Sequence, residues 1–225
     1  MVTPALQNKP QNVFTEALVR TTVKNLQRRN FEAYYCPDKT AALQKALQFI
    51  SKDMLVSWGD SVTLEQLGLL EAIKNGGYNY IDRDSCEDWE KRLVLMRKAI
   101  FSNVYFISAN AISADGVIIN IDRTGNRTSA MAFGPKNVVI IAGVNKIAPT
   151  YRQALARARN VAAPLNIQRR RFDGLNTPCK QGGVCYDCQS PDSICGFIMA
   201  ARHGRNGTDG KPRIKLLIVN ENLGY

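Results

Sequence analysis

The chain has 225 residues, of which 45% are hydrophobic and 22% are charged. This composition is typical of a globular protein, and it excludes a disordered chain, a collagen and a coiled coil. Lys and Arg together number 30 against 19 Asp and Glu, so the formal net charge is +11. A positive balance favours an anionic partner such as a nucleic acid, a phosphorylated metabolite, an acidic protein or a membrane surface; the alternative is a merely soluble surface.

Apolar stretches in the chain are short, and none approaches the roughly 18 residues that a membrane span needs. Residues 1–13 are polar and include Pro4 and Pro10. They lack a charged start followed by an apolar stretch, so we expect no signal peptide, no membrane association and a cytoplasmic location. Thiols stay reduced there, so the six cysteines need an explanation other than a disulfide framework.

The first half of the chain predicts helices that alternate with strands. Apolar residues at helical spacing indicate helices, and short apolar or aromatic runs bounded by Pro or Gly indicate strands. Helices are expected over residues 11–29, 39–51, 64–74 and 85–101, and strands over residues 31–36, 53–57 and 78–81. This alternation predicts crossover connections, helices on both faces and a layered, largely parallel α/β sheet.

The second half changes character. Apolar, β-branched runs at residues 104–108, 117–121 and 138–142 are separated by turns, which adds hairpin-like pairing. Helices are expected over residues 149–161 and 193–202, with Ser190 as a cap, and a basic connector over residues 166–176. A last buried strand is expected at residues 214–219. Because it follows the cysteines, we expect a single domain over residues 1–225, with residues 177–200 as a Cys-rich excursion from it.

Four cysteines, Cys179, Cys185, Cys188 and Cys195, are the strongest chemical signal. The Cys-x-x-Cys pair can hold one metal through both sulfurs, and the flanking Gly and Pro residues let the chain wrap around an ion or cluster. The spacing matches neither a zinc ribbon nor a plant-type iron–sulfur run. We predict that the four cysteines bind an iron–sulfur cluster or zinc. The alternative is four reduced thiols, or a labile disulfide.

Polar residues follow several of the apolar strands, which is where open α/β sheets bind ligands. A turn between a strand and a helix, residues 58–63, offers amides and hydroxyls to a phosphate or carboxylate, although it lacks the second glycine and the lysine of a P-loop. A lysine after a later strand can neutralise an anion. Structural turns and a plain helix cap are the alternatives. The expected ligand-binding residues are Gly59, Ser61, Thr63, Asn110, Asp115, Asn145 and Lys146.

Motifs along almost the whole chain, from about residue 15 to the end, resemble the LUD-domain family. They lie at residues 58–63, 108–116, 120–122, 125–127, 133–136, 142–146, 177–179, 190–192 and 223–225. The resemblance implies a fold similar to ribose-5-phosphate isomerase and CoA transferases, and an association with lactate utilisation. One branch of the family is a subunit of an iron–sulfur-dependent system that oxidises lactate. This chain resembles a sister branch of stand-alone proteins that carry the cysteine tail, and no catalytic residues carry over.

Three functions follow. The first is a LUD-domain protein linked to lactate or related organic-acid utilisation, which binds a small anionic metabolite and passes electrons from its tail to an iron–sulfur oxidoreductase subunit. The second is an isomerase- or transferase-like enzyme acting on a small phosphorylated or carboxylate metabolite, with structural cysteines. A nucleic-acid binder ranks last, because no stacking surface or recognition helix is visible. Self-association is expected by analogy with the fold, and whether the protein is an enzyme is left open.

Overall fold

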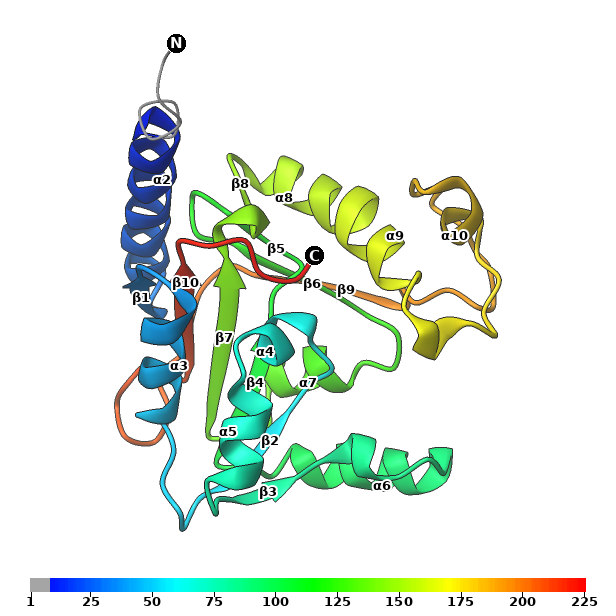
Figure 1. Cartoon of the computed structure of the whole chain (residues 1–225), viewed down its shortest axis with the longest axis horizontal. Helices are drawn as coiled ribbons and strands as arrows, with labels where there is room; N and C mark the ends of the chain where they lie inside the picture. Colours follow the sequence, from blue (N-terminus) through cyan, green and yellow to red (C-terminus); the bar gives the residue numbers. More distant parts are fainter. Residues whose placement is uncertain (1–8) are drawn as a thin grey trace.

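The computed structural model describes residues 9–225, and its centre is a six-stranded sheet (Figure 1). The strand order is β1-β10-β7-β4-β2-β3, and every neighbouring pair is parallel. This confirms the expected largely parallel α/β sheet. The strands are β1 (Glu32–Cys36), β2 (Leu55–Trp58), β3 (Asn79–Ile81), β4 (Val104–Ser108), β7 (Asn137–Gly143) and β10 (Ile214–Val219).

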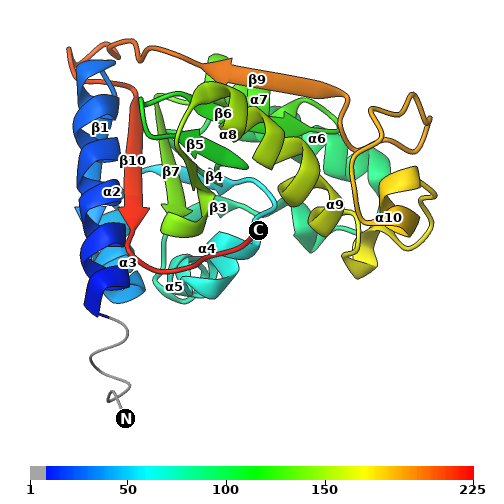
Figure 2. The same ribbon diagram turned by 90° about the horizontal axis from the view of Figure 1, so that it is seen from above.

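A second sheet of four strands lies beside the first, in the order β8-β5-β6-β9 (Figure 2). Strands β5 and β6 pair antiparallel, and the turn between them contains Gly116 at φ 93°, a backbone conformation that favours glycine. The hairpin therefore joins β5 and β6, whereas the expected pairing among residues 104–108, 117–121 and 138–142 does not form: the first and last of these runs are β4 and β7, which pair parallel in the large sheet. The strands are β5 (Ala111–Ser113), β6 (Ile118–Asp122), β8 (Ile147–Ala148) and β9 (Phe197–Ala201).

Helices cover both faces of the large sheet. Alternate residues of one strand enter different cores: Phe106 packs with α3, α4 and α5, whereas Ile107 packs with α2, α7 and the second sheet. Because both faces are buried, the central strands are almost continuously apolar. The helices are α2 (Lys9–Arg28), α3 (Lys39–Leu47), α4 (Val62–Gln66), α5 (Leu69–Asn75), α6 (Trp89–Ala99) and α7 (Asn126–Ala132).

One long helical segment covers the outer face of the second sheet. It consists of α8 (Tyr151–Arg157), the π-helical turn η3 (Ala158–Ala162) and α9 (Ala163–Asn166), and its alanines pack on β5 and β6. The segment is longer than the helix expected at residues 149–161, because its C-terminal turns continue to Asn166. The short helices elsewhere are η1 (Arg83–Ser85), η2 (Val144–Lys146), η4 (Arg170–Phe172) and α10 (Pro178–Gly182).

Two expected helices differ in the structure. The helix expected at residues 64–74 is two helices, because Gly68 between them has φ 73°. The helix expected at residues 193–202 is wrong: residues Phe197–Ala201 form strand β9, which pairs antiparallel with β6. Pairing satisfies the backbone groups along the edge of β6. The hydroxyl of Ser190 accepts from the backbone N–H of Asp192 in a turn and caps no helix.

Strand β10, which follows the cysteine segment, lies between β1 and β7 in the large sheet. The chain therefore returns to the centre of the fold after that segment. Within residues 9–225, no helix combines the length and the apolar content that crossing a membrane requires.

Candidate functional site

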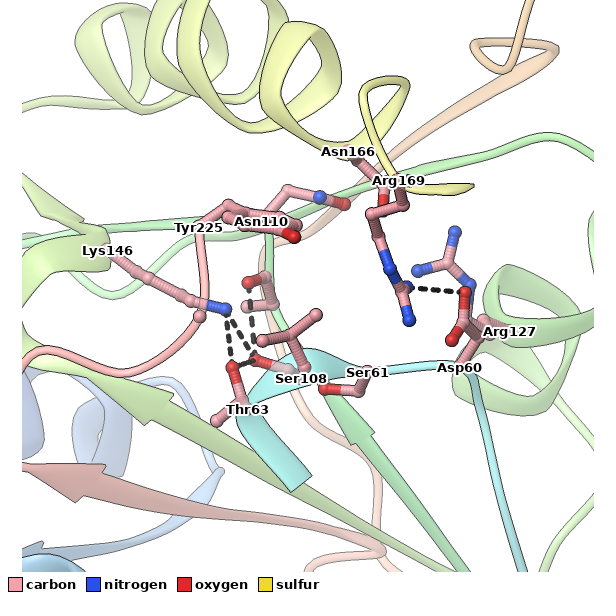
Figure 3. Close-up of a pocket in the computed structure, with 13 residues that line it drawn as sticks. Asp60, Ser61, Thr63, Ser108, Asn110, Arg127, Lys146, Asn166, Arg169 and Tyr225 are labelled. Carbon is pink, nitrogen blue, oxygen red and sulfur yellow. Dashed lines mark hydrogen bonds and ion pairs between the residues drawn. The ribbon is translucent and has the colours of Figure 1, made fainter. Parts of the chain in front are cut away.

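A polar pocket opens beyond the carboxyl ends of β2, β4 and β7, where the segments after these strands meet the last residues of the chain (Figure 3). We call it the lysine pocket. Its empty volume is about 420 Å³. It is lined by Asp60, Ser61, Val62, Thr63, Ser108, Ala109, Asn110, Arg127, Lys146, Asn166, Arg169, Gly224 and Tyr225.

Lys146 is the buried cation of this pocket. It is 4% exposed, and its Nζ donates hydrogen bonds of 2.9 Å to Thr63 Oγ1 and 2.9 Å to Ser108 Oγ (Figure 3). Within residues 9–225 no carboxylate forms an ion pair with it. A protonated amine has three donors, so one remains for a ligand.

The pKa of Lys146 is lowered from 10.5 to about 7. Burial is the largest cause, because it penalises the charged amine, and the positive charges of Arg157 and Arg127 add to it. The side chain therefore changes its charge near neutral pH. An anion that enters the pocket would favour the protonated form.

The local sequence explains how these groups meet. Parallel strands end at the same edge of a sheet, so Ser108 at the end of β4 lies beside the short helix η2 that follows β7 and carries Lys146. Thr63 comes from α4, which follows β2. Ser61 is the N-cap of α4, and its hydroxyl accepts from the N–H of Leu64 at 3.4 Å.

Asp60, at the rim of the lysine pocket, pairs with two arginines, of which Arg169 also lines this pocket and Arg171 does not. Arg169 Nη1 donates to Asp60 Oδ2 at 2.8 Å (Figure 3), and Arg171 Nη1 pairs with the same oxygen at 2.5 Å. Burial opposes ionisation of Asp60, but Arg171, Arg169 and Arg83 together hold its pKa below the usual value. Asp60 is therefore an anion that positions arginines, and the rim keeps an excess of positive charge.

The structure brings four of the seven expected ligand-binding residues to this pocket, namely Ser61, Thr63, Asn110 and Lys146. The amide oxygen of Asn110 accepts from the N–H of Ile121 at 2.8 Å. This bond fixes the side chain at the pocket wall.

The other three expected residues have different surroundings. A Cβ at Gly59 would lie 2.7 Å from Arg127 Cγ, so the absence of a side chain there lets the arginine reach the pocket. Asn145 accepts from the N–H of Leu223 at 3.0 Å and holds the end of the chain. Asp115 lies outside the lining, and its carboxylate pairs with Arg29 at 3.0 Å.

Sequence reasoning missed Arg127, Asn166 and Arg169 as lining residues. Residues 166–176 were interpreted as a basic connector, yet Arg169 is bonded to Asp60, 109 positions earlier in the chain. No local pattern indicates such a pairing. Ser108 belongs to a polar run at the exit of an apolar strand, but it was not among the expected ligand-binding residues.

A second cavity adjoins the lysine pocket and shares Asp60, Arg127 and Asn166 with it. We call it the arginine pocket. Its empty volume is about 840 Å³. The remaining lining residues are Arg83, Trp89, Arg92, Met96, Asp122, Arg123, Thr124, Asn126, Arg171, Phe172 and Ile194.

A third cavity, the cysteine pocket, is lined by all four cysteines of the tail and by Arg159, Ala163, Thr177, Tyr186, Asp187, Ser193, Ile194 and Ile198. The four sulfurs are free of disulfides. The pKa of Cys195 is raised to about 11, first by burial and then by the charges of Cys179, Cys185 and Cys188. The four thiols therefore lie close enough for their charges to interact.

The cysteine pocket contains side chains that can bind a metal ion, but they are not arranged as the ligands of a metal site. Four thiols suit zinc or iron, which favour thiolate ligands. In the part of the chain that the structure describes, however, no group of three or more Cys, His, Asp or Glu side chains is arranged to hold a metal ion. The tail would have to draw its sulfurs closer together to bind one.

Comparison with known proteins gives a family and a fold. The family model described as the LUD domain matches residues 19–219. No curated protein matches the chain. A crystal structure of a DUF162 family protein from Deinococcus radiodurans is similar, with a TM-score of 0.51 and 10% sequence identity over 91% of this chain and 98% of that chain. At this identity the similarity shows the fold alone.

Proposed function

This chain belongs to the LUD-domain family, and we propose that it binds a small organic anion in the lysine pocket as part of lactate or related organic-acid utilisation. The ligand class is a hydroxy or keto acid or a phosphorylated metabolite. The observation that carries the proposal is Lys146, a buried amine without a carboxylate partner in the described chain, which lines a polar pocket beyond the strand ends. A buried charge needs a counter-charge, and the ligand would provide it.

The roles of the side chains follow from their contacts. Protonated Lys146 neutralises the anion and donates one hydrogen bond to it. The hydroxyls of Thr63 and Ser108 fix the position of the amine, since both accept from its Nζ. Arg169, held in place by Asp60, attracts the anion to the entrance.

The same groups support a second candidate, an isomerase- or transferase-like enzyme acting on a metabolite of this class. An amine with a pKa of about 7 can take up and return a proton at neutral pH. The hydroxyls of Ser108 and Thr63 each lie 2.9 Å from Lys146 Nζ, so either can exchange a proton with the amine. Turnover of a bound acid, lost in Lys146→Met, would distinguish an enzyme from a binding protein.

The binding test is calorimetric titration of the protein with lactate, pyruvate, glycerate and glycerol 3-phosphate at constant ionic strength. At least one anion should bind saturably to the wild type, and Lys146→Met should weaken binding about tenfold or more, the effect of losing a charged hydrogen bond. Lys136→Met is the matched control, because Lys136 is exposed and precedes β7 at the opposite end of that strand. Equal binding by the two variants would contradict the proposal.

We also propose that the cysteine pocket binds zinc or an iron–sulfur cluster through Cys179, Cys185, Cys188 and Cys195. The convergence of four thiols on one pocket supports this. Zinc would crosslink the tail, whereas a cluster would supply one-electron transfer to an iron–sulfur oxidoreductase partner.

Metal and sulfide analysis of protein purified without oxygen tests this second proposal. We expect near-stoichiometric zinc, or iron with sulfide, and its loss in Cys188→Ser. Cys86→Ser is the control, since Cys86 does not line the cysteine pocket. Metal-free wild-type protein whose tail resists proteolysis would show that the four thiols are structural.

A further inference from the structure

One arginine that lines the arginine pocket is buried, and its Nε has no hydrogen-bond acceptor within residues 9–225. Arg83 in η1 is 6% exposed, and its Nε is inaccessible to water and makes no hydrogen bond within residues 9–225. Its one ion pair in the described chain joins this Nε to Asp84 Oδ2 at 3.6 Å, which is too long for a hydrogen bond. Buried guanidinium groups are normally bonded on several sides, so Arg83 lacks a partner.

Arg83 is one of three such residues on the same pocket. Arg92 Nε and Asn126 Nδ2 are also buried donors without an acceptor in the described chain, although Arg92 Nη2 donates to Asp84, and both residues line the arginine pocket. The three come from different elements, namely η1, α6 and α7. Their convergence indicates a site for an acceptor-rich ligand, because unsatisfied buried donors are rare and costly.

The charges of the lining residues indicate the charge of that ligand. Five arginines line the pocket against two aspartates, Asp60 and Asp122. Both carboxylates are already engaged: Asp60 pairs with Arg169 and Arg171, and Asp122 pairs with Arg127 at 3.1 Å. Outside the lining, Asp84 pairs with Arg92 and lies 3.6 Å from Arg83 Nε. Five arginines still outnumber these three aspartates, so the missing acceptor is an anion.

The two pockets are connected. Asp60, Arg127 and Asn166 line both of them, so a ligand held at Lys146 lies beside the wall of the arginine pocket. A molecule with one anionic group would engage Lys146 and leave the arginine pocket without a ligand. A molecule with an anionic group at each end would engage both.

We propose that the arginine pocket is a second anion subsite, for a phosphate or a carboxylate, and that the ligand of this protein carries two separated anionic groups. One group binds at Lys146, and the other binds in the arginine pocket, among Arg83, Arg92 and Asn126. This inference rests on the proposed function, since it extends the ligand that the lysine pocket would bind. It narrows the ligand class to phosphorylated acids and dicarboxylates.

Calorimetric titration with matched probes tests the inference. Glycerate carries a carboxylate alone, glycerol 3-phosphate carries a phosphate alone, and 3-phosphoglycerate carries both; malate is the dicarboxylate arm. We expect 3-phosphoglycerate or malate to bind about tenfold or more tightly than either probe with a single anionic group, the gain from one added charged hydrogen-bonding group. A gain for malate alone would identify a carboxylate subsite, and a gain for 3-phosphoglycerate a phosphate subsite.

Variants test whether the gain in affinity comes from the second subsite. Arg83→Met should reduce the affinity for the probe with two anionic groups to that for glycerate and leave glycerate binding unchanged. Should Arg83→Met fail to fold, Arg92→Gln changes a more exposed member of the same pocket and is expected to reduce the same gain. Arg205→Gln is the control, since Arg205 is exposed and lies outside both pockets.

Two results would overturn the inference: probes with two anionic groups that bind no more tightly than probes with one, or a pocket variant that weakens the binding of glycerate and of the two-group probe by the same factor. Failure of the proposed function would give a different result. In that case glycerate binding would not depend on Lys146 at all, whatever the affinity of the two-group probes.

Discussion

Lys146 Nζ lies 2.9 Å from Ser108 Oγ although 38 positions separate the two residues in the chain. The contact exists because β4 and β7 are adjacent parallel strands, so the segments that follow them meet at one edge of the sheet. It places a titratable amine and a hydroxyl at the base of a polar pocket. Anion binding and the stability of the fold should therefore both depend on the charge state and the position of this amine.

Anion binding should weaken as the pH rises through about 7. The pKa of Lys146 is lowered to about 7, so the amine is charged below this pH and neutral above it. Affinity for a carboxylate whose own charge is constant should fall up to about tenfold per pH unit above 7. Titrations from about pH 6 to about pH 9 measure the trend. In Lys146→Met the affinity should vary little with pH, and the same steep decline in that variant would assign it to another group.

The free energy of unfolding should change with pH in the opposite direction from anion binding, because Lys146 loses its proton in the folded chain first. Between pH 7 and 10.5 the unfolded chain holds a proton on this lysine that the folded chain lacks. The burial cost of the charge is therefore full below pH 7, and it disappears as the pH rises to 10.5. The free energy of unfolding of the wild type should rise with pH relative to Lys146→Met, by a total on the order of a few kcal/mol. Urea unfolding of both proteins at several pH values measures this difference, and parallel curves would contradict it.

Gly59→Ala should disturb the pocket through Arg127. The added Cβ would lie 2.7 Å from Arg127 Cγ and 2.8 Å from its Cδ, so the arginine must move. We expect a loss of about 1–3 kcal/mol in the free energy of unfolding and weaker anion binding. Gly174→Ala is the control, because no atom lies within 4 Å of a Cβ there. The prediction fails if both substitutions have the same effect.

Asp60→Asn should lower stability at neutral pH and much less in acid. The pKa of Asp60 is held below its usual value by the arginines around it, so its ionised form contributes stability above the unfolded-state pKa of about 4, and this contribution is lost as the pH falls through the folded-state pKa. We expect a loss of about 1–3 kcal/mol at neutral pH, the range for a hydrogen bond to a charged group. Thermal unfolding at neutral and acid pH measures it. A pH-independent loss would mean that the charge of Asp60 is not what holds Arg169 and Arg171.

The sequence predicts the centre of the fold well. The runs that form β4, β7 and β10 are apolar at nearly every position because helices or a second sheet bury both faces, and this pattern is visible without a structure. Strand β9 was mistaken for a helix. Its residues are largely exposed, so the burial pattern is weak, and its conformation depends on pairing with β6. Such pairing leaves no local trace in the sequence.

The candidate site was predictable where it follows the strand-end rule and hidden where it depends on long-range contacts. Ser61, Thr63, Asn110 and Lys146 were expected because they follow strands. Arg169 was not, because only the fold brings it to Asp60. The buried donors of the arginine pocket that lack an acceptor were also hidden in the sequence. A missing hydrogen bond can be recognised only when the positions of all neighbouring residues are known.

The most direct test of the central claim is the titration of Lys146 itself by NMR, following the nitrogen and terminal carbon signals of its side chain. We expect a pKa near 7 in the free protein, since burial and two arginines lower it to about 7. The pKa should rise when pyruvate, malate or 3-phosphoglycerate is added, because a bound anion favours the charged amine. A Lys146 signal that titrates near 10.5, the ordinary value, or that none of these anions shifts, would show that Lys146 is not the anion-binding group.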